Sequence, residues 1–144
     1  MPIHLADSDA DVLRCFPVMH ELRTHLVRGE FLERVRRQER QGYRIAYVEE
    51  GGDVCAVAGF RLLECLASGR TLYVDDLVTA DSRRSRGHGA ALVEWLAAHA
   101  REHDCDWLQL DSGVHRRDAH RFYFRQRLDI RSFHFERDLR GASA

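Results

Sequence analysis

Lysine and asparagine are absent from this chain of 144 residues, and isoleucine occurs only at Ile3, Ile45 and Ile130. All three amino acids use codons rich in A or T, so a GC-rich bacterial genome explains their scarcity. Because all 22 basic residues are therefore arginine, their abundance is not evidence for nucleic-acid binding. The absence of lysine excludes a Schiff-base enzyme, a pyridoxal-phosphate enzyme and a P-loop nucleotide site.

A strong charge of one sign, long apolar runs and closely spaced cysteines are also missing. The net charge is −1, so no overall field favours nucleic acid or an anionic membrane. No apolar run approaches the ~18 residues of a membrane span, and no secretory segment is expected. The four cysteines form no Cys-x-x-Cys pair, and no spacing of His and Cys fits zinc. We expect a cytoplasmic protein with reduced thiols and no metal.

The pattern of apolar residues predicts a single α/β domain over residues 1–144 with a mixed sheet. Asp7, Ser8 and Asp9 are candidates to cap the first helix, and Gly51-Gly52 predicts a hairpin turn. The expected order is strand 3–5, helix 10–26, helix 31–41, strands 43–48, 54–66 and 71–79, helix 90–103, strand 107–110, helix 118–126 and strand 130–137.

The most informative segment is Arg84-Ser85-Arg86-Gly87-His88-Gly89, which lies between a predicted strand and a predicted helix. The start of a helix leaves backbone N–H groups without partners and carries the positive end of the helix dipole. Glycine allows an anion to approach the backbone closely. The segment therefore predicts a pyrophosphate site to which His88 contributes mainly its backbone. A dinucleotide fingerprint does not fit, because the third glycine and the acidic ribose partner are missing.

Two motifs carry a resemblance to a known family. Leu77-Val78-Thr79 followed by Arg84-x-x-Gly87-x-Gly89-Ala90 resembles motif A of the GCN5-related N-acetyltransferase (GNAT) family, and Ala119-x-x-Phe122-Tyr123 is similar to a helix motif near that family's C-terminus. The resemblance implies acetyl-CoA as co-substrate and an amine as acceptor. It also implies a mixed central sheet that is splayed at the acetyl-CoA site and flanked by about four helices.

The resemblance further implies which backbones bind acetyl-CoA. The pantetheine arm and the thioester are expected along Leu77, Val78 and Thr79. The pyrophosphate is expected on the segment made of Arg84, Ser85, Arg86, Gly87, His88, Gly89 and Ala90.

Catalytic roles follow from the same resemblance. Tyr123 matches a tyrosine that protonates the leaving thiolate, and a phenol with a pKa of about 10 is protonated at neutral pH. Asp75 matches a position where some members carry a glutamate that accepts the ammonium proton, directly or through water. Asp75 and Asp76 are successive strand residues, so we expect their side chains on opposite faces, with Asp76 structural. His115 is a second candidate base, since imidazole titrates near pH 6.5.

Two positions depart from the family pattern. Arg116 stands where many members have an asparagine that contacts coenzyme A, and Arg127-Leu128 replaces Gly-Phe at the end of the last helix. Little chain follows Leu128. The usual last strands are therefore either shortened or completed by the partner subunit of a homodimer.

The predicted function is direct transfer of the acetyl group of acetyl-CoA to a primary amine in a ternary complex. A small molecule is the favoured acceptor, and the first two helices are expected to form its wall. Acidic residues at their junction suggest a cationic amine; the junction residues are His20, Glu21, His25 and Glu30. Two alternatives stay open: a non-catalytic acyl-CoA-binding or sensing domain, and acetylation of a protein or aminoacyl-tRNA amine. The near-neutral charge gives tRNA little support.

Overall fold

A computed structural model describes residues 2–141 and divides the chain into two compact units, Met1–Leu110 and Asp111–Ala144. The first unit is an open five-stranded sheet in the order β1-β2-β3-β4-β5. Neighbouring strands are antiparallel except for β4 and β5, which are parallel. The strands are β1 (Ile3–Leu5), β2 (Tyr43–Glu50), β3 (Asp53–Cys65), β4 (Gly69–Thr79) and β5 (Trp107–Leu110).

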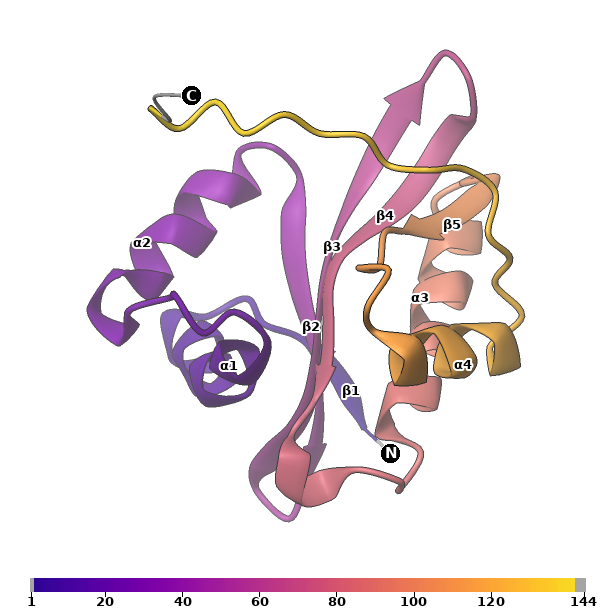
Figure 1. The fold of residues 1–144 in the computed structure, drawn as a ribbon. Coiled ribbons are helices and arrows are strands. Elements are labelled where there is room, and N and C mark those ends of the chain that lie inside the picture. Colours follow the sequence, from indigo (N-terminus) through magenta and orange to yellow (C-terminus); the bar gives the residue numbers. More distant parts are fainter. Residues whose placement is uncertain (1, 142–144) are drawn as a thin grey trace. The chain divides into compact units, whose positions relative to one another are not determined.

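Helices cover both faces of this sheet (Figure 1). α1 (Asp9–Leu22) and α2 (Arg28–Glu39) lie on one face, and α3 (His88–Glu102) lies on the other. Successive residues of β2 therefore enter different cores: Ile45 packs with α1 and α2, and Ala46 packs with the α3 side. Burial on both faces explains the continuous apolar run from Ile45 to Val48 within β2.

The predicted mixed α/β fold and its four helices are confirmed, with shifted helix ends. α1 stops at Leu22 instead of reaching residue 26, and α2 begins at Arg28 rather than at residue 31. The predicted cap of α1 is Ser8, whose hydroxyl accepts a hydrogen bond from the Asp11 N–H at 3.1 Å. Strand 107–110 matches its prediction at both ends.

The second unit contains α4 (Arg117–Arg125). The prediction of a strand over residues 130–137 is wrong, because none of these residues has strand structure. A strand needs a ladder partner, which alternation of side chains along the sequence cannot provide. After α4, Arg127 has φ +67°. This residue replaces the family's glycine in the left-handed conformation that favours glycine.

Candidate functional site

The glycine turn forms the start of α3. Gly87 is the N-cap with φ +82°, and no side chain caps the helix. The first internal hydrogen bond runs from the Ala91 N–H to the Gly87 carbonyl at 3.0 Å. The N–H groups of His88, Gly89 and Ala90 therefore belong to the first helical turn, where no earlier carbonyl is in reach. This geometry is suited to an anion.

The part of β4 that precedes this turn in the chain has one unpaired edge. β5 pairs only with Thr71–Val74 of β4, so the following part of β4, up to Thr79, has no strand on that side among residues 2–141. The Ala80 N–H donates to the Cys55 carbonyl on the β3 side at 2.8 Å. Since successive N–H groups of a strand alternate between its two edges, those of Leu77 and Thr79 face the open edge. An extended ligand could pair with them as a strand would.

The His88 side chain is buried beneath the turn, with 1% of its surface exposed. Its Nε2 lies 3.3 Å from Glu50 Oε2, but the geometry is not that of a hydrogen bond. Donor atoms of Glu50, Cys55 and His88 lie within 4.8 Å of one another, a grouping that could hold a metal ion. These residues come from separate elements, so sequence spacing did not reveal them. The absence of a metal remains a prediction.

A β-bulge at Asp75 corrects the prediction for the two aspartates. Gly59 pairs with Asp76, and the next residue of β3 pairs with Val74, which leaves Asp75 as an extra residue in β4. The alternation of β4 is therefore reversed beyond the bulge: Val74 and Leu77, three residues apart, both pack on the α3 side. Asp75 and Asp76 consequently line one cavity on the α1–α2 side, not opposite faces.

Each carboxylate of this pair has its own cation. Arg61 of β3 donates from Nε to Asp75 Oδ2 at 2.9 Å, and its Nη2 forms an ion pair with the same oxygen at 2.9 Å. Arg23, at the end of α1, donates from Nε to Asp76 Oδ1 at 2.8 Å and from Nη2 to the Asp75 carbonyl at 2.7 Å. The Tyr43 hydroxyl donates to Asp76 Oδ2 at 2.7 Å. Asp76, Arg23 and Tyr43 are thus joined by hydrogen bonds and form what we call the floor of the cavity. These contacts are consistent with a structural role for Asp76.

Burial shifts two pKa values in this network. Burial raises the pKa of Asp75 above its usual range, and the hydrogen bonds and charge of Arg61 oppose the shift. Burial, together with the charge of Asp76, raises the pKa of Tyr43 well above that of a free phenol. The Tyr43 hydroxyl is therefore protonated at neutral pH and donates a hydrogen bond to Asp76. The Asp75 carboxylate is more basic than that of an exposed aspartate.

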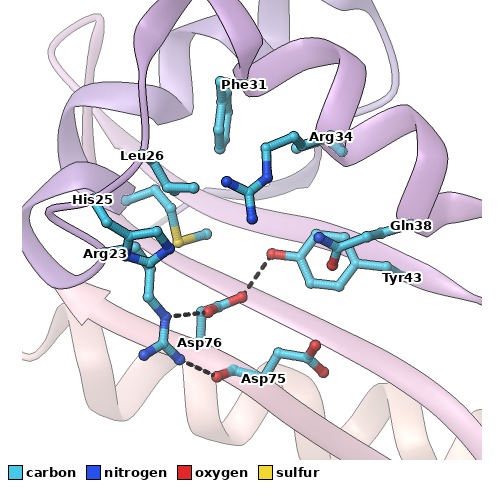
Figure 2. A pocket seen from close by; sticks show the side chains of 11 residues that line it. Arg23, His25, Leu26, Phe31, Arg34, Gln38, Tyr43, Asp75 and Asp76 are labelled. Atoms are coloured by element: carbon cyan, nitrogen blue, oxygen red, sulfur yellow. Dashed lines mark hydrogen bonds and ion pairs between the residues drawn. The ribbon is translucent and has the colours of Figure 1, made fainter. Parts of the chain in front are cut away.

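The cavity has a volume of about 250 Å³ and opens between α1, α2 and the sheet (Figure 2). Of the four predicted wall residues, His25 lines it. Glu21 instead accepts a hydrogen bond from the Asp81 N–H at 2.8 Å. The lining residues are Met19, Arg23, His25, Leu26, Phe31, Arg34, Val35, Gln38, Tyr43, Asp75 and Asp76.

Gly59 permits the floor of this cavity to form. A Cβ at this position would lie 2.0 Å from the Tyr43 hydroxyl oxygen and 2.4 Å from Asp76 Oδ2. Only glycine leaves room for the Tyr43–Asp76 hydrogen bond. Sequence reasoning missed this position, together with Arg23, Arg61 and Tyr43. An isolated glycine inside an apolar strand was the available signal.

The other predicted residues lie in the second unit. Tyr123 is on α4, with its ring centroid 5.6 Å from that of Phe122. His115 precedes α4 and lies against Gly113. Arg116, which replaces the family's asparagine, is the N-cap of α4 and makes no side-chain capping hydrogen bond.

Comparison with known proteins decides the family. The model of the acetyltransferase (GNAT) family matches residues 10–128. The chain belongs to this family. It is 33% identical over 109 residues to YhdJ, an N-acetyltransferase of Bacillus subtilis (strain 168) described as uncharacterized, covering 75% of this chain and 77% of that protein. The predicted enzyme class, an acetyltransferase, is thereby confirmed, and the family implies acetyl-CoA as co-substrate.

Two further comparisons are informative. The chain is 32% identical over 66 residues to an aminoalkylphosphonate N-acetyltransferase of Salmonella typhimurium (strain LT2), covering 46% of this chain and 43% of that one. A crystal structure of a transcriptional regulator from Bacillus halodurans C-125 superposes with a TM-score of 0.84 at 16% identity, covering 96% of this chain and 99% of that one. The second comparison supports the fold alone.

Among residues 2–141, no helix combines the length and the apolar character needed to cross a membrane.

Proposed function

We propose that this GNAT acetyltransferase transfers the acetyl group to the primary amine of a small molecule, by direct attack in a ternary complex. The pantetheine arm of acetyl-CoA would pair with the open edge of β4 at Leu77, Val78 and Thr79. Its pyrophosphate would lie on the backbone from Arg84 to Ala90. The acceptor amine would enter the cavity beside Asp75. The name of the Salmonella relative, an aminoalkylphosphonate acetyltransferase, also favours a small acceptor.

One observation carries this proposal. The bulge places the Asp75 carboxylate in the cavity together with that of Asp76, and the open edge begins on the same strand. Leu77 is two residues further along, about 7 Å at ~3.3 Å per residue. A thioester held on the edge near Leu77 and an amine held near Asp75 would therefore meet without any movement of the sheet.

The proposed reaction conserves atoms and charge. Asp75, directly or through a water molecule, accepts a proton from the ammonium group, and the free amine attacks the thioester carbonyl carbon. An N–H group of Leu77 or Thr79 stabilises the developing oxyanion. The carbon–sulfur bond breaks, and the leaving thiolate takes a proton from the Tyr123 hydroxyl. The attacking nitrogen loses its second proton, which restores the Tyr123 hydroxyl, and Asp75 releases the first proton to solvent. The products are the N-acetyl amine, coenzyme A thiol and one proton released to solvent.

Release of free thiol from acetyl-CoA across a panel of amino acids, aminoalkyl compounds, polyamines and peptides tests the proposal. We expect Tyr123→Phe to lower turnover by about 100-fold, the lower range for general acid catalysis, and to leave coenzyme A binding by calorimetry unchanged. Tyr47→Phe is the matched control, because Tyr47 is buried at 3% exposure on β2 and is assigned no catalytic role. Equal turnover of wild type and Tyr123→Phe with every acceptor would exclude the acid role.

The same measurements separate the alternatives. A non-catalytic sensing domain would bind coenzyme A and acetylate no amine in the panel. Acetylation only of peptides or aminoacyl-tRNA would assign a macromolecular acceptor. The cytoplasmic location and the homodimer remain predictions, and sedimentation velocity tests the second.

A further inference from the structure

The charges that line the cavity, together with Arg61 behind it, do not cancel. Asp75 is paired with Arg61, and Asp76 is paired with Arg23, so both carboxylates already have a cation. Arg34 also lines the cavity, from α2. No ion pair or hydrogen bond of its guanidinium is found among residues 2–141, although every other arginine named in this network has an acidic partner. Once Arg61 and Arg23 are counted against the two carboxylates, the remaining charge is positive and lies on Arg34.

The two kinds of charge lie on different walls. Figure 2 shows the Arg34 side chain reaching from α2 into the cavity, while Asp75 and Asp76 lie on the strand beneath it. Tyr43 and Arg23 hold the floor in place. A ligand that spans the cavity would therefore meet carboxylates at one end and a guanidinium at the other.

We propose that the acceptor is a small zwitterionic amine, whose ammonium group faces Asp75 and whose carboxylate or phosphonate group is bound by Arg34. The inference rests on the proposed function, because the amine end must reach the reacting thioester. A guanidinium binds such planar or tetrahedral oxyanions through paired, charge-assisted hydrogen bonds. A diamine would place its second ammonium against Arg34 and would be repelled.

The size of the cavity limits the acceptor. A volume of about 250 Å³ corresponds to about eight water molecules at ~30 Å³ each. An amino acid or an aminoalkylphosphonate fits this space, whereas a peptide must extend out of it. The acceptor class is therefore a short molecule in which a few carbon atoms separate the amine from the anion.

Four acceptors with the same amine spacing test the assignment: 2-aminoethylphosphonate, β-alanine, ethanolamine and ethylenediamine. The wild-type enzyme is expected to show a kcat/KM at least tenfold higher for the two anionic amines than for the other two. Arg34→Gln should lower kcat/KM for the anionic amines by about 10- to 100-fold, the range of a lost charge-assisted bond, and change the value for ethanolamine less than twofold. Arg34→Lys should recover part of the loss.

Arg37→Gln is the matched control, since Arg37 is an exposed residue of the same helix and does not line the cavity. Its four kcat/KM values should equal those of the wild type. Equal use of ethanolamine and the anionic amines by the wild type, or an equal loss for all acceptors in Arg34→Gln, would overturn the inference while leaving the acetyl transfer intact.

Calorimetric measurement of 2-aminoethylphosphonate binding distinguishes failure of the proposed acetyl transfer from failure of the anion subsite at Arg34. Binding that Arg34→Gln weakens at least tenfold, without any thiol release, would support the anion subsite and refute the acetyl transfer. An affinity that is the same in the wild type and Arg34→Gln would refute the anion subsite.

Discussion

The two halves of the candidate site adjoin the same strand but are built from different parts of the chain. From Leu77 to Ala90 the polar groups are backbone N–H groups at an open edge and a helix start. At Asp75 and Asp76 they are side chains, each held by an arginine from another element. The comparison teaches that the first half depends on backbone conformation, and the second on long-range pairs that a single substitution removes.

The largest effect is expected at the side-chain half. Asp75→Asn should lower kcat by about 100-fold and leave the KM for acetyl-CoA unchanged. In the wild type, kcat/KM should fall as the pH is lowered through the pKa of Asp75, which burial raises, because only the deprotonated carboxylate accepts a proton. That acid limb should be missing from the profile of Asp75→Asn.

Glu64→Gln is the control for this substitution, since Glu64 is an exposed carboxylate of β3 that does not line the cavity. An unaltered acid limb in Asp75→Asn would show that another group is the base. His115 would then be the next candidate.

Gly59→Ala probes the packing of the same half. The new methyl group would overlap the Tyr43 hydroxyl and Asp76, so the free energy of unfolding should fall by about 2 kcal/mol, within the range for overpacking. Urea denaturation measures this change. Gly29→Ala is the control, because nothing lies within 4 Å of its Cβ position, and it should be neutral or slightly stabilising in a helix. Equal stability of the two variants would show that the floor adapts to the methyl group.

A smaller effect is expected at the backbone half. Gly87→Ala must hold an alanine at φ +82°, which costs about 1–2 kcal/mol and disturbs the N–H groups around the turn. The KM for acetyl-CoA should rise by about tenfold, and the KM for the amine should stay unchanged. Gly42→Ala, at φ +89° and away from the turn, should lose similar stability without a change in either KM. A rise in the KM for the amine would contradict the division into two halves.

The fold was largely predictable from the sequence because its signals are local. Strand 107–110, the hairpin at Gly51-Gly52 and the Ser8 cap all depend on a few neighbouring residues. The strand over 130–137 was mispredicted because its existence depends on a pairing partner, which no local pattern supplies. The end of α1 also differed from its prediction: the helix stops at Leu22, and its C-cap Arg23 donates to Asp76 of β4, a contact that the local sequence does not show.

The site was predictable to different degrees in its two halves. Glycines at fixed spacing mark a backbone-built turn, so the segment from Arg84 to Ala90 was visible in the sequence. Arg61 and Asp75 are 14 positions apart in the sequence, and Arg23 and Asp76 are 53 positions apart. No local sequence pattern around these residues predicts that they pair. Strict alternation assigned Asp75 and Asp76 to opposite faces, because a bulge cannot be read from two adjacent aspartates.

The bulge at Asp75 also decides where β4 can change its length. Before it, Leu72 and Val74 pack toward α3; after it, Leu77 does so and Val78 packs on the opposite face. Deleting Asp75 would remove the bulge and restore regular alternation while leaving Leu77 and Val78 on their present faces. Deleting one residue elsewhere in β4 would instead carry the side chains on one side of the deletion to the wrong face. Asp75 is therefore the position at which the strand could lose a residue without repacking its core, although the cavity would lose one of its two carboxylates.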